Sequence, residues 1–195
     1  MDDLSRQSSD EGFQLNEFKC KELRNSFTNN NLTFNPILLN GKPLEEMTSA
    51  KLLGLNISSD LRWNVHVLEL GKKASCRLYF LRQLKRSQVK TEELMLFYIT
   101  CIRCILEYAC PAFHLALPSY LSEDLERLQK RALWIIYPGL SYNQALQFSG
   151  LAPLFKRREY ISSKLFNEVK LLPKEESGFC LTFVQEQSMQ NIFHF

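Results

Sequence analysis

The spacing of apolar residues changes near Asp60 from a period of two to a period of about 3.6. Before this point, short apolar runs separated by turn residues predict strands, and after it longer amphipathic stretches predict helices. We therefore expect a mainly α protein in three parts. These are a small β-hairpin or sheet remnant over residues 1–59, a helical bundle over 60–174 and a divergent tail over 175–195.

Three stretches of the amino-terminal part predict strands. Residues 19–27 have a weak strand pattern, and residues 36–44 predict a hairpin, because an Asn-Gly pair supplies the two positive-φ residues of a type I′ turn. Pro43 has no N–H to donate, so its strand should lie at a sheet edge. Residues 51–57 predict a third strand, in which Gly54 allows a ligand or another backbone to approach closely.

The helix predicted after Asp60 has one apolar and one basic side. Its apolar side, at spacings of three and four, consists of Val67, Leu70, Ala74, Leu78 and Leu81. The basic residues between Leu70 and Thr91, a stretch without any acid, are Lys72, Lys73, Arg77, Arg82, Lys85, Arg86 and Lys90. Of these, Lys72, Arg82 and Arg86 cluster with Tyr79 opposite the apolar side, so this side could hold phosphates and stack a base, or it could be an ordinary solvated face.

Four further helices are predicted. Thr91 is the expected N-cap of a helix that is apolar nearly all round, should be central and buried, and ends or kinks at Pro111. The helix near Ser122 has the apolar stripe Leu121, Leu125, Leu128, Ala132 and Ile135. A short helix covers residues 141–148, and the last one begins at Pro153. Its inward residues should be Leu154, Ile161, Leu165 and Val169.

Composition favours a folded, intracellular chain. The 195 residues are 45% hydrophobic, which is ample for a core. The net charge of +3 divides into −3 over residues 1–60, +8 over residues 61–175 and −2 over residues 176–195, so a polyanion partner would meet the helical part. The start does not resemble a secretory signal, and we expect no apolar run to reach the ~18 residues that span a bilayer. We expect no membrane segment and reduced thiols.

No motif predicts catalysis. A Gly-rich phosphate loop, HExxH and GxSxG are all absent, and the three histidines lack ligand spacing. Cys101 and Cys104 form a C-x2-C without a second ligand pair, so they are interpreted as small core residues. We predict no catalytic residue, no metal and no cofactor. Two smaller basic clusters, at 127–131 and 156–158, join the one on the first helix.

Five stretches, in order, resemble the reverse transcriptases of non-LTR retrotransposons of the LINE type (jockey-like). They cover residues 13–27, 51–67, 72–86, 105–136 and 142–159. The resemblance implies the end of a polymerase palm followed by a helical thumb. It places Lys51, Leu53 and Gly54 near a primer grip and the basic helix along the template–primer backbone.

The departures from that family bear on activity. The fingers, most of the palm and the YADD-type catalytic motif are absent, and Asp2-Asp3 lies too close to residue 13 to replace it. Two-metal phosphoryl transfer needs carboxylates that hold both ions. The resemblance therefore implies a non-catalytic fragment with weak, sequence-independent affinity for RNA or DNA.

Two alternatives stay open. Residues 72–86 also resemble the short amino-terminal segment of AlkB-type tRNA-modifying dioxygenases, although no H-x-D…H iron triad occurs here. The chain could otherwise be a structural or interaction module that self-associates through an exposed sheet edge. RNA or DNA is thus one expected partner and a second copy of the chain another.

Overall fold

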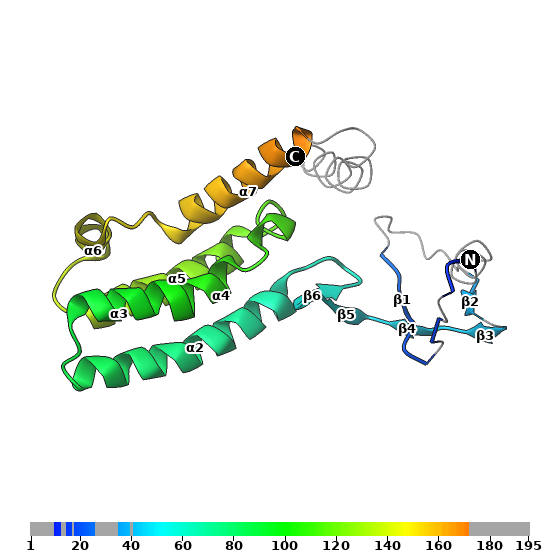
Figure 1. Ribbon diagram of the computed structural model, residues 1–195, viewed down its shortest axis with the longest axis horizontal. Helices are drawn as coiled ribbons and strands as arrows, with labels where there is room; N and C mark the ends of the chain where they lie inside the picture. The colour runs from blue at the N-terminus through cyan, green and yellow to red at the C-terminus, as the bar shows by residue number, and fades with distance from the viewer. Residues whose placement is uncertain (1–9, 13–14, 17, 26–34, 40, 172–195) are drawn as a thin grey trace. The chain divides into compact units, whose positions relative to one another are not determined.

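The computed structural model describes residues 10–12, 15–16, 18–25, 35–39 and 41–171. It divides into two compact units, Met1–His66 and Val67–Phe195. Short strands make up the described part of the first unit and helices that of the second (Figure 1). The expected fold class, mainly α with a small amino-terminal sheet remnant, is confirmed. The predicted tail over 175–195 lies outside the described residues.

Two of the predicted strand regions are confirmed. Strand β1 (Lys21–Leu23) pairs in parallel with β4 (Glu45–Met47). Strands β2 (Leu38–Leu39) and β3 (Lys42–Pro43) form the expected hairpin, with Gly41 at a φ of 76° in its turn. The other turn residue of this hairpin lies outside the described part of the chain.

The predicted single strand over residues 51–57 is wrong. The chain instead forms a second hairpin, in which β5 (Ser49–Leu52) pairs antiparallel with β6 (Leu55–Ser58). The turn residues Leu53 and Gly54 have φ values of 47° and 83°, and two positive φ angles in succession are what a type I′ turn requires. The glycine therefore serves the turn, and the adjacent Leu53 is 83% exposed.

Helix α2 (Asn64–Arg86) confirms the first predicted helix. All five residues of the predicted apolar side are buried, each at most 4% exposed: Val67, Leu70, Ala74, Leu78 and Leu81. The chain enters the helix through a turn at Asp60, whose carboxylate accepts a hydrogen bond from the Arg62 N–H at 3.0 Å. A hydrogen bond from the Ser58 hydroxyl is the main cause that lowers the pKa of Asp60.

The second predicted helix is continuous from α3 (Thr91–Phe97) through the wider turns of η1 (Tyr98–Arg103) to α4 (Cys104–Glu107). Only one side of it is buried, along a row spaced by four residues: Leu94, Tyr98, Ile102 and Leu106. Leu96 and Ile99 are 61% and 41% exposed, so the expectation of a helix buried all round is wrong.

Both ends of this helix also differ from the prediction. Lys90 is the N-cap, and Thr91 is the first helical residue without a side-chain capping bond. The helix ends at Glu107, before Pro111, because Ala109 takes a left-handed conformation with φ of 50°. The proline then begins the short turn η2 (Cys110–Ala112), where its missing N–H costs nothing.

The segment Thr91–Ala112 is 22 residues long and apolar enough to cross a membrane by length and composition. The expectation that no described segment reaches this threshold is therefore wrong. Only 28% of its most apolar window is buried. Since the core helix of a soluble protein satisfies the same criterion, length and composition assign no membrane role to it.

Three more helices complete the second unit: α5 (Ser119–Ile136), α6 (Tyr142–Ser149) and α7 (Leu154–Lys170). Helix α5 packs against both α6 and α7, and α7 packs on η2. Of the predicted α5 stripe, Leu128 is half-buried and the other four residues are buried. Ser141 and Gln144 form a capping box at the start of α6, and Gly150 ends it with φ of 67°.

Helix α7 buries different residues from those predicted. Leu154 is buried as expected, but Leu165 is 45% exposed. The fully buried positions further along are Arg158 and Ser162, which are 0% and 2% exposed. Polar side chains thus occupy part of the interface that the periodicity assigned to leucine, and they introduce a polar interior described below.

Candidate nucleic-acid interface

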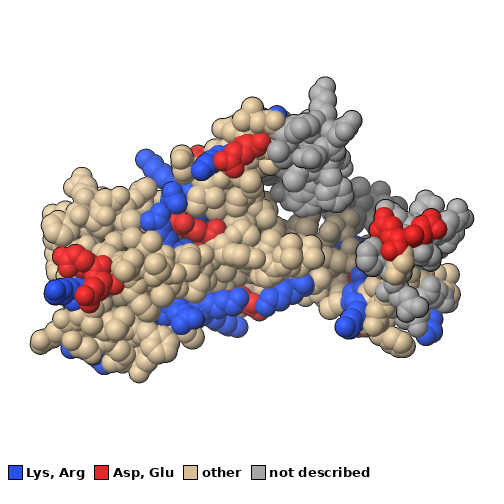
Figure 2. Space-filling view, viewed as in Figure 1, with Lys and Arg blue, Asp and Glu red and all other residues tan. Residues whose placement is uncertain are grey.

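The outer side of α2 is both basic and aromatic. Seven of the exposed residues of this helix are called the α2 face: Lys72, Lys73, Cys76, Arg77, Tyr79, Phe80 and Arg86. Lys72, Cys76 and Tyr79 lie opposite the buried side because a helix repeats every 3.6 residues, and Arg77, seven residues after the buried Leu70, lies at its edge. In Figure 2 a band of Lys and Arg follows the surface of α2. The face therefore presents positive charge to solvent along the helix.

The cations of the α2 face are not neutralised by the fold. Within the described residues, no ion pair or hydrogen bond engages the side chains of Lys72, Lys73, Arg77 or Arg86. No acid occurs between Leu70 and Thr91 in the sequence. Lysine and arginine side chains left free in this way can contact phosphate oxygens, and arginine can do so with two parallel bonds.

Two aromatic rings lie between these cations. Tyr79 is 57% exposed and Phe80 is 50% exposed, and their ring centroids are 5.8 Å apart at an interplanar angle of 74°. Sequence reasoning singled out Tyr79 but missed Phe80. The available signal was helical phase, because Phe80 follows Lys73 by seven residues and so lies on the same side of the helix.

Two residues predicted as nucleic-acid contacts have other surroundings. Arg82 is half-buried at the flank of the α2 face. The Lys85 ammonium donates a hydrogen bond at 3.0 Å to the carbonyl oxygen of Ile136, the last residue of α5. Lys85 therefore satisfies an open carbonyl at the negative end of α5 and joins the two helices.

The primer-grip-like residues belong to the first unit. Lys51 is exposed in β5, and Leu53 and Gly54 form the turn of the second hairpin. The α2 face belongs to the second unit. The prediction of a primer-grip role stays a prediction.

The basic cluster of α7 is divided by the fold. Lys156 is exposed, whereas the Arg157 guanidinium lies 3.5 Å from a carboxylate oxygen of Glu107. Arg158 is completely buried, and its Nη2 donates to the hydroxyl of Ser122 at 2.7 Å. Burial is the main cause that lowers the pKa of Arg158, with the nearby carboxylates acting in the opposite direction.

The smaller basic patch of α5 is engaged by neighbouring side chains. Arg127 forms an ion pair with Asp124, one turn earlier. Lys130 lies over the ring of Tyr142, 5.2 Å from its centroid. Compared with the α2 face, this patch offers fewer free cations to a polyanion.

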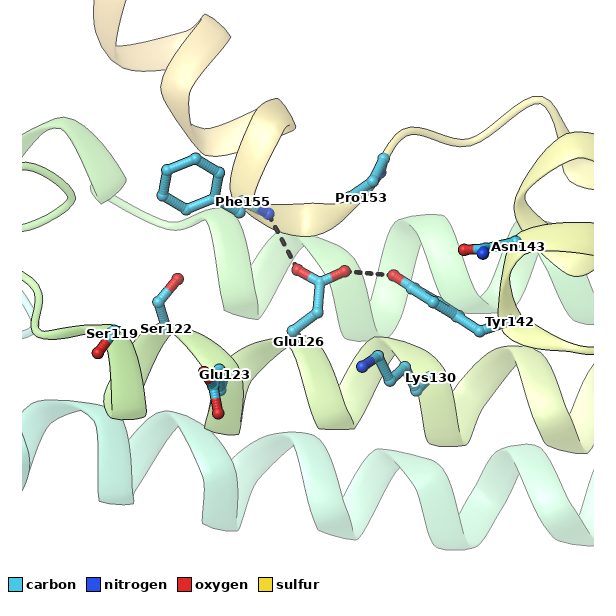
Figure 3. A pocket seen from close by; sticks show the side chains of 9 residues that line it. All are labelled: Ser119, Ser122, Glu123, Glu126, Lys130, Tyr142, Asn143, Pro153 and Phe155. Atoms are coloured by element: carbon cyan, nitrogen blue, oxygen red, sulfur yellow. Dashed lines mark hydrogen bonds between the residues drawn. The ribbon is translucent and has the colours of Figure 1, made fainter.

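A pocket of about 470 Å³ opens between α5, α6 and α7, and Figure 3 shows Glu126 at its centre. One oxygen of Glu126 accepts the N–H of Leu154 at 3.0 Å and the hydroxyl of Tyr142, and the other accepts the N–H of Phe155 at 3.0 Å. Both carboxylate oxygens are thus used to cap the first turn of α7.

Gln129 extends this network into the core. Its amide nitrogen donates to the Tyr142 hydroxyl at 2.9 Å and to the Ala152 carbonyl at 3.1 Å. Its carbonyl oxygen accepts the buried Tyr98 hydroxyl at 2.6 Å. Burial raises the pKa of both tyrosines, so they stay protonated donors. The network holds α5, α6 and α7 together.

The described cysteines are free thiols with different exposure. Cys76 and Cys104 are exposed, Cys20 and Cys101 are half-buried, and Cys110 is buried. The interpretation of Cys104 as a core residue is therefore wrong; its thiol donates to the Thr100 carbonyl one turn earlier at 2.7 Å. In the described part of the chain, no group of three His, Cys, Asp or Glu could hold a metal ion.

Fold and face together define a small helical module with an exposed basic and aromatic helix. The family model described as "Alkylated DNA repair protein alkB homolog 8, N-terminal" matches residues 63–103. This range contains the whole α2 face together with α3 and η1, and it ends before α4. No curated protein and no solved structure matches the chain.

Proposed function

We propose that this protein is a nucleic-acid-binding helical module that contacts the phosphate backbone through the α2 face. One observation carries the proposal: four cations of this face, Lys72, Lys73, Arg77 and Arg86, have no partner within the described residues. The family match to an alkB homologue, whose description names alkylated DNA repair, supports it because the matched range includes these residues.

Phosphate contacts of this kind predict how strongly the binding affinity depends on salt concentration. Each neutralised phosphate releases counterions, so affinity falls with salt at a slope of about −0.7 to −0.9 per contact. Four contacts give a slope of about −3 on a double-logarithmic plot. The binding should be insensitive to base sequence, because Lys and Arg contacts to phosphate carry no sequence information.

Fluorescence anisotropy with a labelled RNA strand at several salt concentrations tests the proposal. The combined variant Lys72→Ala, Lys73→Ala and Arg77→Ala should lose most of the binding and most of the salt slope. The matched control is Lys156→Ala, Lys164→Ala and Lys170→Ala, which removes the same charge from exposed residues of α7. No binding at low salt, or equal loss in both variants, would refute the proposal.

A second candidate is a thumb-like fragment of a non-LTR retrotransposon reverse transcriptase. The order of the five resembling stretches supports it, as does the β5–β6 hairpin directly before a basic helix. This candidate predicts tighter binding to an RNA–DNA duplex than to single strands. It also predicts no primer extension with Mg²⁺, because the YADD-type motif is absent from the sequence.

The enzyme alternative is tested separately. A preparation supplied with iron and 2-oxoglutarate should show no turnover on alkylated RNA or DNA, because the sequence has no H-x-D…H triad. Turnover above that of a buffer control would replace the binding-module proposal with an oxygenase.

A further inference from the structure

We propose that the α2 face selects single-stranded nucleic acid by stacking an unpaired base on Tyr79 and Phe80. This inference rests on the function proposed above and adds the class of ligand. Its starting point is the aromatic pair, which phosphate binding alone does not explain. Lysine and arginine side chains are sufficient for backbone contacts, and exposed rings add nothing to them.

The two rings form a corner that suits one flat base. They come from consecutive residues, and their planes meet at 74° with centroids 5.8 Å apart. A base stacked on the face of one ring therefore presents its edge to the other ring, which is a favourable aromatic geometry. Both side chains are at least half exposed, so a base reaches them without opening the bundle.

Cations lie on both sides of this corner along the helix. Lys72 and Arg86 are each seven residues from Tyr79, and Lys73 is seven residues from Phe80. Seven residues correspond to two helical turns, or about 10 Å along the axis. A strand that runs along α2 can thus place phosphates near Lys72 and Arg86 while a base between them turns inward onto the rings.

A duplex cannot use the face in the same way. Paired bases are stacked on each other, so their π-faces are covered and only their edges are accessible in the grooves. Against a duplex the two rings would face phosphates and groove water. A single strand offers an unpaired base that can stack on them.

The test compares one labelled 12-nucleotide RNA with the blunt duplex of the same sequence, by anisotropy at one fixed salt concentration. We expect the single strand to bind at least about tenfold more tightly, since stacking contributes about ten- to a hundredfold in affinity per base. The double variant Tyr79→Ala and Phe80→Ala should lose this preference and keep the duplex affinity. Tyr79→Phe should retain it.

The control variant is Trp134→Ala, which removes a ring that is 65% exposed on α5. It should leave both affinities unchanged. Equal affinity for strand and duplex, with no effect of the double variant, would overturn this inference and leave phosphate binding intact. No binding of either nucleic acid would overturn both proposals. A dimer that disappears in Phe80→Ala, without any RNA binding, would also overturn both and assign the face to self-association.

A chemical footprint gives an independent readout. The exposed thiol of Cys76 lies three residues before Tyr79, and Cys104, which is also exposed, lies on α4. Saturating single-stranded RNA should slow the alkylation of Cys76 several-fold, measured by mass spectrometry, and should leave the rate at Cys104 unchanged. Equal slowing at both thiols, or none at Cys76, would contradict a base stacked beside it.

Discussion

Two clusters of three basic residues illustrate how the same sequence signal acquires opposite roles. Lys72, Lys73 and Arg77 on α2 are exposed and have no ion-pair partner within the described residues. In the α7 cluster, Arg157 lies near Glu107 and Arg158 is completely buried against Ser122. The first cluster is available to a ligand, and the second is largely part of the structure.

The difference arises from helical phase and from nearby acids. On α2, Lys72 falls opposite the apolar side and Lys73 and Arg77 lie at its flank, and all three are exposed in a stretch without acidic residues. On α7 the residue at position 158 falls on the inward side, one turn after Leu154, and Glu107 approaches its neighbour from α4. A basic cluster therefore indicates a binding surface only when its members face solvent and no carboxylate is within reach.

The largest effect that tests this comparison comes from Arg158→Ala. Loss of a completely buried long side chain, and of its bond to Ser122, should lower the free energy of unfolding by about 3 kcal/mol in urea denaturation. Arg77→Ala on the exposed α2 face should change it by less than about 0.5 kcal/mol. For RNA affinity, Arg77→Ala should have the larger effect and Arg158→Ala the smaller.

Arg158→Met separates charge from packing. Methionine fills much of the same volume and removes Nε and Nη1, which have no hydrogen-bond partner among the described residues. We expect a loss below about 1 kcal/mol. If Arg158→Met is as destabilising as Arg158→Ala, the charge itself holds the interface, and the structural role assigned to this cluster has to be revised.

The second effect concerns the carboxylate that caps α7. Glu126→Ala should cost about 2 kcal/mol, because it leaves the N–H groups of Leu154 and Phe155 and the hydroxyl of Tyr142 without their acceptor. The matched control is Glu123→Ala, one turn earlier on the same helix and exposed. The control should stay within about 0.5 kcal/mol in the same urea titration. Equal losses would contradict the capping role.

Much of the helical part was predictable because its pattern is long and periodic. The buried side of α2 and the capping box of α6 follow directly from spacing and side-chain chemistry. The tip of the second hairpin was not predictable from its residues. Leucine at positive φ is uncommon, so Leu53 gave no turn signal, and an apolar run was interpreted as one strand.

The interior polar residues were missed for a different reason. Arg158 and Gln129 are buried because Ser122, Tyr98 and Tyr142 supply partners from other helices. The periodicity of a sequence indicates which side of a helix a residue lies on, but it does not identify partners from other helices. The α2 face was largely foreseen because exposure on a helix depends on phase alone, while the engagement of Lys85 depends on α5 and was not.

Lys85 tests whether one member of the predicted binding set belongs to the fold. Lys85→Met should lower the free energy of unfolding by about 1.5 kcal/mol, because the Ile136 carbonyl loses a charged donor at the end of α5. RNA affinity should change less than in Lys72→Met, which removes the same charge from an exposed position. Equal losses of affinity in the two variants would show that Lys85 belongs to the binding surface.

The smallest effect compares thiols of the exposed and buried regions. Burial raises the pKa of the Cys110 thiol to about 11, and its Sγ lies 4.0 Å from the Arg158 carbonyl oxygen. Because the folded pKa is raised, the stability from this group is fully present below the ordinary thiol pKa and is lost as pH rises toward 11. Urea denaturation at pH 8 and pH 10 should show a loss of about 1 kcal/mol in the free energy of unfolding that is absent in Cys110→Ala.

At pH 9 an alkylating agent should modify the exposed Cys76 and spare Cys110. Equal modification of both thiols would show that the interior around Arg158 opens to solvent.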